Sequence, residues 1–261
     1  MKALFSGSFK RDAAEWFSKL AFPLVFLGEA GSARPQFFRR KRELLYYLDL
    51  CGVKSLPVVI LISLLMGAII ALQGALQMRK VGTEIFVIDL VGLAVLKEFG
   101  PLMVAMISTG RAGSAFAAEI GTMKVNEEIS ALETMGVNPY GYLVHPKLAA
   151  MLISMPLLTV FGDFFGIMGG MLVGTTSLDI PLTAYWGRSI AVLDGVNLLL
   201  GIIKSTVFGV LITLAGCCCG FASSGDAQGV GRGATQAVVA SIFLVVVADA
   251  IMTLLYTFIG Y

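Results

Sequence analysis

Residues 56–78 read LPVVILISLLMGAIIALQGALQM, an apolar stretch without a charged side chain. An α-helix rises about 1.5 Å per residue, so a helix of this length crosses the roughly 30 Å of hydrocarbon in a bilayer. This stretch therefore predicts a membrane-spanning helix, and it decides the fold class.

Four further stretches are also long and mainly apolar, although each contains at least one charged residue: 85–109, 148–174, 196–220 and 237–259. Of the 261 residues, 57% are hydrophobic and 14% are charged, whereas a typical soluble domain has about 25% charged residues. The sequence thus predicts an all-α integral membrane protein with about five transmembrane helices. Its net charge of +2 is too small to indicate nucleic-acid binding.

The N-terminal region, residues 1–53, differs from the predicted transmembrane region, 54–261. Apolar residues between Phe9 and Leu27 recur at three- and four-residue spacing. This pattern favours an interfacial amphipathic helix that lies on the membrane or, alternatively, on a partner subunit. The basic run at 39–42 is expected to face anionic cytoplasmic lipid.

Basic residues are unevenly distributed between the two sides of the membrane. Residues 1–54 hold ten Lys or Arg, whereas the predicted loops on the opposite side hold only Arg79, Lys80 and Arg188. The positive-inside rule therefore places the N-terminus in the cytoplasm and the C-terminus outside.

Five charged residues lie deep inside the predicted spans: Lys97, Glu98, Asp163, Lys204 and Asp249. An unpaired ion at such a depth costs about 2.5–3.5 kcal/mol on insertion scales, so these groups are expected to share one polar network. Asp249 is the expected partner of Lys204, with Glu98 as the alternative. Structural pairing and a direct role in lipid headgroup handling or gating both remain open.

One stripe of the first span could line a cavity for acyl chains. Its members are Met66, Ile69, Ile70, Leu72, Gln73, Leu76 and Gln77. A mostly apolar face with two glutamines one turn apart suits such a wall. Ordinary packing inside a helix bundle explains the stripe equally well.

Glycines recur at four-residue spacing in the third predicted span, at Gly162, Gly166, Gly170 and Gly174. A ridge of small residues lets another helix backbone approach closely. The ridge therefore predicts tight helix packing and does not identify a substrate.

Residues 110–146 form the longest predicted connection, and it lies on the cytoplasmic side. Within it, 114–135 predicts one helix with an apolar ridge and an acidic flank, ended by Gly136. Such a coupling helix suits docking to another protein, and the alternative is that it covers the end of its own bundle. The residues assigned to docking are Arg111, Glu119, Ile120, Met123, Lys124, Glu127, Glu128 and Glu133.

The sequence contains no recognisable motif for catalysis or nucleotide binding. It lacks the GxxxxGK[S/T] phosphate loop, HExxH and GxSxG, and the glycine-rich run at 229–233 is expected to be a flexible connection. Cys51 stands alone, and the cysteines at 217–219 are consecutive, so their side chains diverge on a helix and cannot enclose a metal. We therefore expect no catalytic chemistry, no cofactor and no metal in this chain.

Five short motifs resemble the MlaE/YrbE permease family. They are LKEFGP at 96–101, GRAGSA at 110–115, AEIGTM at 118–123, LETMGVNP at 132–139 and LLT at 157–159. The similarity extends from about the first span to the C-terminus, in the same order and with the same span layout.

The resemblance implies the permease subunit of an ABC-type lipid transporter in the bacterial inner membrane, with a periplasmic C-terminus. The expected partners are a second copy of the chain, a cytoplasmic ATPase that binds ATP, an MCE-domain protein on the outer side and, in some systems, a STAS-domain protein. The implied substrate is phospholipid that moves between the inner and outer membranes.

Two other functions compete with this reading. A secondary transporter would use the buried acids as proton or ion sites, but it would be expected to show inverted repeats that the sequence lacks. A non-transporting scaffold subunit would have a filled dimer interface without bound lipid.

Overall fold

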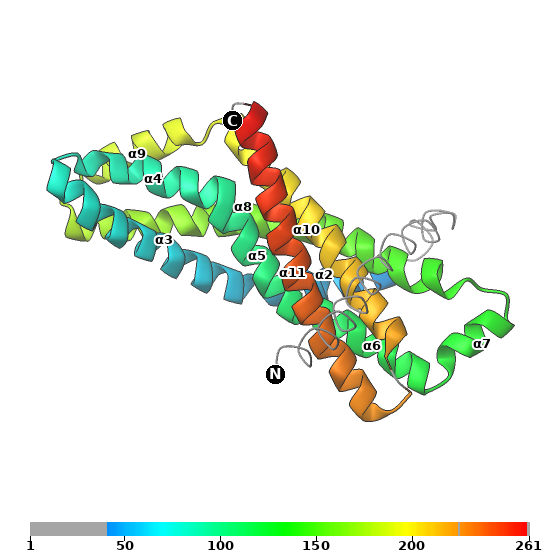
Figure 1. The fold of residues 1–261 in the computed structure, drawn as a ribbon. Coiled ribbons are helices and arrows are strands. Elements are labelled where there is room, and N and C mark those ends of the chain that lie inside the picture. Colours follow the sequence, from blue (N-terminus) through cyan, green and yellow to red (C-terminus); the bar gives the residue numbers. More distant parts are fainter. Residues whose placement is uncertain (1–40, 224, 260–261) are drawn as a thin grey trace, which may run out of the picture.

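The structure is a computed structural model that describes residues 41–223 and 225–259. The predicted amphipathic helix within residues 1–40 lies outside this part of the chain. All regular structure in the described residues is helical (Figure 1), as the sequence predicts.

The helices follow one another from α2 to α11, with short 3₁₀ or π-helical segments marked η. Their bounds are α2 Lys41–Cys51, η1 Val53–Ser55, α3 Leu56–Met78, η2 Arg79–Val81, η3 Glu84–Phe86, α4 Val87–Ala94, η4 Val95–Phe99, α5 Gly100–Ser108, η5 Thr109–Gly113, α6 Ser114–Val125, α7 Glu128–Thr134, α8 Pro139–Ser177, α9 Leu182–Val192, α10 Gly195–Ala222 and α11 Ala227–Ile259.

Five helical stretches of the described chain are long and apolar enough to cross a membrane. They are Lys41–Met78, Val87–Val125, Pro139–Ser177, Gly195–Ala222 and Ala227–Ile259. The five predicted spans are therefore confirmed in number and position, although most of these helices extend beyond the predicted limits.

The sequence predicts that the second span ends at residue 109, but the structure shows a longer helix. Helix continues from Val87 to Val125 through two π-helical turns, η4 and η5. In each turn an N–H bonds to the carbonyl five residues earlier, from Gly100 to Val95 and from Ser114 to Thr109. The π turn η5 keeps the TGRAG sequence at 109–113 helical, although it contains two glycines. The prediction of a loop that begins at residue 110 is therefore wrong, because residues 110–125 are helical.

The predicted helix at 114–135 is divided in two by Asn126 and Glu127. Glu127 has a φ of 60°, which breaks the helical path before α7 begins. After α7, Gly136 has a φ of 72°; its N–H bonds to the Glu133 carbonyl, and the Val137 N–H bonds to the Leu132 carbonyl. These two bonds form a Schellman motif, so the predicted helix stop at Gly136 is confirmed.

Two further segments differ from the sequence-based expectation. The glycine-rich run at 229–233 lies inside α11, so its assignment as a flexible connection is wrong. The short helix α9 was not predicted, and it packs beside α4 and α8. Figure 1 shows α9 and the α3–α4 connection at one end of the molecule and α7 at the opposite end.

The glycine ridge of α8 is a contact surface for neighbouring helices. A Cβ on Gly166 would lie 2.9 Å from a methyl group of Val95, and one on Gly174 would lie 2.8 Å from the ring of Tyr185. The closest backbone approach is to α3, where a Cβ on Gly67 would overlap the carbonyl of Gly166. The predicted close packing is therefore present.

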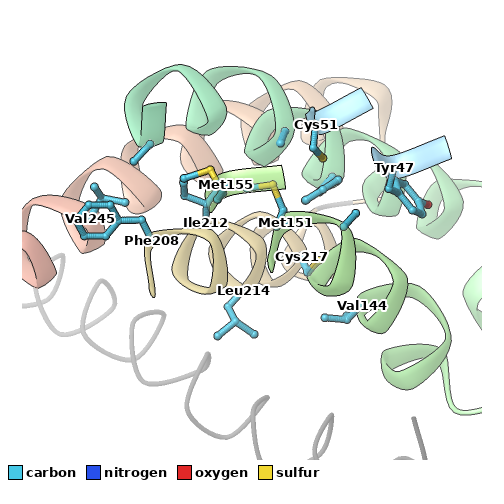
Figure 2. Packing of buried hydrophobic residues seen from close by; sticks show 14 of the residues in the cluster. Tyr47, Cys51, Val144, Met151, Met155, Phe208, Ile212, Leu214, Cys217 and Val245 are labelled. Carbon is cyan, nitrogen blue, oxygen red and sulfur yellow. The ribbon is translucent and has the colours of Figure 1, made fainter. Parts of the chain in front are cut away.

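The largest hydrophobic core lies between α2, α5, α6, α8 and α10, with Val245 added from α11. Figure 2 shows Met151 and Met155 of α8 facing Ile212 of α10, with Cys217 nearby. The cysteines at positions 51 and 217 are buried and unpaired, so they behave as small apolar residues in this core.

Candidate functional site

A buried lysine on α10 organises an ion cluster inside the bundle. Nζ of Lys204 lies 2.8 Å from Oε2 of Glu98 and 2.9 Å from Oδ1 of Asp249. The same ammonium donates to Oγ1 of Thr253 at 2.8 Å, and that hydroxyl donates to Oε1 of Glu98 at 2.9 Å. Three spans are thus joined through one cation, because Glu98 belongs to the second span, Lys204 to the fourth, and Asp249 and Thr253 to the fifth.

The backbone brings these groups together by a close helix approach. A Cβ at Gly201 of α10 would lie 2.5 Å from the carbonyl oxygen of Leu96, so only glycine fits there. Leu96 and Glu98 both lie in the π turn η4, which therefore packs against α10 less than one helical turn from Lys204. The Lys204 side chain is 1% exposed, whereas the Glu98 side chain is 35% exposed, so the cluster reaches the surface of the chain through its carboxylates.

The sequence predicts that Lys204 pairs with Asp249 or, alternatively, with Glu98. In the structure it pairs with both. The expectation of one network with five members is wrong for two of them. The ion pairs of the described residues do not join Lys97 or Asp163 to this cluster. Lys97 is half-buried beside Glu98, and Asp163 is buried with Oδ1 lacking a hydrogen-bond partner among the described residues.

The stripe on α3 is largely exposed in the single chain. Leu72 is 46% exposed and Leu76 is 67% exposed. Ile69, Gln73 and Gln77 are also exposed, whereas Met66 and Ile70 are half-buried. Most of the stripe therefore does not pack inside its own bundle, and a cavity-lining role stays a prediction.

A second buried lysine lies nearer to α7, on α8. Nζ of Lys147 lies 3.1 Å from Oε1 of Glu119 and 2.9 Å from the hydroxyl of Tyr47, and it sits 4.5 Å from the centre of the Tyr47 ring. The Tyr47 hydroxyl donates to the same Oε1 at 2.6 Å. These contacts join α2, α6 and α8.

Several residues assigned to docking instead contact their own chain. Ile120 is fully buried in the core, so its assignment to a docking surface is wrong. Arg111 donates to the Lys54 carbonyl. Lys124 donates to the carbonyls of Phe221 and Ser223, at the end of α10.

The remaining docking candidates are distributed around α7. Glu127, Glu128 and Glu133 are exposed, and Met135 beside them is 69% exposed, whereas Met123 is half-buried. An acidic surface with one large apolar residue is therefore the part of the predicted segment that is free to meet a partner.

Sequence reasoning missed Lys147 and Tyr47. Lys147 directly precedes the stretch predicted as the third span, and Tyr47 lies before the first, so neither falls inside a predicted span. The helix start at Pro139, with Asn138 Oδ1 accepting the N–H of Tyr140, places Lys147 two turns inside α8. The Asn-Pro pair was the available signal for this earlier helix start.

Comparison with known proteins agrees with this architecture. Residues 44–255 match the family described as Permease MlaE. The chain belongs to the MlaE permease family. The match includes the second, third and fourth spans, most of the first and the fifth, both lysine clusters and α7.

Relatives of this MlaE-family chain come from bacteria and from a plant. A probable ABC transporter permease protein of Rickettsia prowazekii is 39% identical over 82% of each chain. The intermembrane phospholipid transport system permease protein MlaE of Haemophilus influenzae is 31% identical over 95% of this chain and 96% of its own. The chloroplastic protein TRIGALACTOSYLDIACYLGLYCEROL 1 of Arabidopsis thaliana is 31% identical over 81% of this chain and 61% of its own.

Proposed function

We propose that this chain is the permease subunit of an ABC transporter that moves phospholipid between the inner and outer membranes of a bacterium. The similarity to the Haemophilus influenzae phospholipid permease carries the proposal, because it covers nearly the whole of both chains. ATP hydrolysis is assigned to a partner ATPase.

The proposed assembly is a homodimer in the inner membrane, with the lipid between the protomers. The exposed stripe of α3 supports this arrangement, because large apolar side chains such as Leu72 and Leu76 need a partner helix or lipid. An MCE-domain protein would bind on the outer side, and a STAS-domain protein could join the complex. The N-terminus would lie in the cytoplasm and the C-terminus in the periplasm.

The ATPase is proposed to dock on α7. The exposed glutamates at 127, 128 and 133 give this segment a negative charge, and Met135 adds an apolar contact. Because α6 is the end of the second span and leads into α7, a movement of α7 would reach the helix that carries Glu98.

Transport and docking are tested together in proteoliposomes. The complex copurified from native membranes, with its proteins and lipids identified by mass spectrometry, is expected to transfer labelled phospholipid when ATP is supplied. Transfer driven by a proton gradient without ATP would instead support a secondary transporter. Glu133→Lys with Met135→Asp should release the ATPase while leaving the bundle folded, and unchanged copurification would disprove docking on α7.

The cavity is tested with photo-crosslinkers at Leu72, Gln73, Leu76 and Gln77. These positions should capture phospholipid more efficiently than a control at Leu157, an exposed residue of α8. Equal labelling at all positions would indicate annular lipid only.

A further inference from the structure

Asp163 on α8 has no ion pair among the described residues, unlike other carboxylates in the described spans. Asp89 pairs with Arg188 at 2.7 Å, and Glu98 pairs with Lys204 at 2.8 Å. Asp163 is 3% exposed, and none of the ion pairs of the described residues includes it. Its Oδ1 also lacks a hydrogen-bond donor in this part of the chain.

The position of this carboxyl group is set by a glycine. A Cβ at Gly100 would overlap Oδ1 of Asp163, so any larger residue at position 100 would displace the carboxyl group. The backbone of α5 thus leaves room for an acid that has no cation partner among the described residues. An unpaired carboxylate at such a depth is costly, and a cation beside it would offset that cost.

Asp163 lines a cavity of about 160 Å³ between α8, α9 and the start of α10. The remaining wall is almost entirely apolar, and it includes two aromatic residues, Phe164 and Trp186. Phe164 is 50% exposed and Trp186 is 47% exposed, so the cavity opens at the outer surface of the bundle. It is distinct from the exposed stripe on α3.

We propose that this cavity binds an organic ammonium group, with Asp163 as the counter-ion and the rings of Phe164 and Trp186 as the cation-binding faces. A carboxylate next to aromatic rings in an apolar pocket is the arrangement that recognises quaternary ammonium ligands. An inorganic cation would need several oxygen ligands, and the wall offers mainly carbon. An anion would be repelled by the carboxylate.

The chain provides its own reporter for this site. It contains two tryptophans, Trp16 and Trp186, so Trp16→Phe leaves Trp186 as the single tryptophan. The full chain with this substitution is placed in liposomes of phosphatidylglycerol, a lipid that carries no ammonium group. Tetramethylammonium is the probe, and tert-butanol is a neutral probe of similar shape.

Tetramethylammonium should change the Trp186 emission saturably, and tert-butanol should not. Asp163→Asn should weaken the apparent affinity for tetramethylammonium at least about tenfold, the factor expected when a desolvated cation loses its counter-ion. Asp179→Asn is the matched control, because Asp179 is an exposed acid just beyond α8, and it should leave the affinity unchanged. Equal affinities of the Asp163→Asn variant and its parent, or an equal response to tert-butanol, would overturn the proposal.

A second variant keeps the test decisive if Asp163→Asn does not fold. Phe164→Leu keeps the carboxylate and removes one ring, so it should weaken tetramethylammonium binding about threefold or more. Unchanged binding in this variant would overturn the proposed role of the aromatic wall.

Liposomes of phosphatidylcholine identify the source of the ammonium group. If a lipid headgroup fills the cavity, added tetramethylammonium will no longer change the emission there. If the ligand is a free cation, the response will match that in phosphatidylglycerol. Both outcomes support the site, and they assign it to different ligands.

Discussion

Lys204 and Lys147 are both fully buried lysines, but they are neutralised in different ways. Lys204 contacts two carboxylates, those of Glu98 and Asp249, and the cluster has one more acid than base when all three groups are ionised. Such a cluster depends on charge balance, because removal of its only cation leaves two acids facing each other.

The surroundings of Lys147 are less acidic. Its ammonium contacts one carboxylate, that of Glu119, and the hydroxyl and ring of Tyr47. The Glu119 side chain is 34% exposed, so water can solvate it if the lysine is lost. The comparison indicates that the Lys204 cluster is held by charge and the Lys147 cluster by a combination of charge, hydrogen bonds and packing.

The largest effect is expected for Lys204→Met. An unpaired charge left in a buried site costs about 3–5 kcal/mol, and here two acids lose their common partner. We expect lipid transport below about a tenth of wild type and a clear loss of thermal stability, measured on the purified complex. Lys80→Met, at an exposed lysine in η2, is the control and should behave as wild type.

A charge exchange separates pairing from a simple need for lysine at position 204. The double variant Lys204→Asp with Asp249→Lys restores a cation next to two acids, so it should recover part of the transport lost in either single variant. If the double variant transports no better than both singles, the Lys204–Asp249 pair does not explain the loss.

Lys147→Met should have a smaller effect than Lys204→Met. The variant keeps the volume of the side chain and leaves Glu119 with the Tyr47 hydroxyl, so the expected loss is about 1.5–3 kcal/mol, the value of a hydrogen bond to a charged group. Chemical denaturation of the purified chain measures this loss. A loss as large as that of Lys204→Met would contradict the distinction between the two clusters.

Single neutralisations sharpen the comparison within the Lys204 cluster. Glu98→Gln and Asp249→Asn each leave one carboxylate for the lysine, so each should destabilise the chain by only about 1–2 kcal/mol. Asp249→Asn should be the more harmful of the two, because the Asp249 side chain is 16% exposed and that of Glu98 is 35% exposed. Thermal unfolding of both variants under one condition gives the order, and the reverse order would contradict it.

The smallest effect is expected for Tyr47→Phe. The ring stays over the ammonium of Lys147 and only the hydroxyl bridge is lost, so about 1 kcal/mol of stability should disappear. A shift of a few degrees in the thermal unfolding of the purified chain would agree with this value. Tyr46→Phe is the control, because Tyr46 is 58% exposed on the same helix. A larger loss than for Lys147→Met would mean that the hydroxyl, and not the charge, holds this cluster.

Apolar length was enough to predict the five spans, because a helix that crosses a bilayer must satisfy its backbone internally. The same signal could not locate α9, which has only eleven residues and carries Arg188 in its middle. Its buried positions, Tyr185 and Ser189, are four residues apart and gave only a short amphipathic pattern.

Charge inside the spans predicted the Lys204 cluster, including its two acids. It could not separate Asp163 from that cluster, because depth along a helix does not give the direction of a side chain. Lys147 was missed for a related reason: a lysine at the edge of an apolar stretch is usually solvated, and only its contacts with Glu119 and Tyr47 show that it is buried.

The two π turns, η4 and η5, have a consequence for the angular phase of the second span. Each residue of an α-helix turns the chain by about 100°, and a π turn holds about one residue more than an α turn, so the two turns together rotate α6 by roughly 200° relative to an unbroken helix. With this rotation, Phe116 and Ile120 of α6 are fully buried in the core. Deleting one residue from either turn would therefore rotate the part of the span that follows it by about 100°. Substitutions within a turn that keep its length would leave the orientation of that part unchanged.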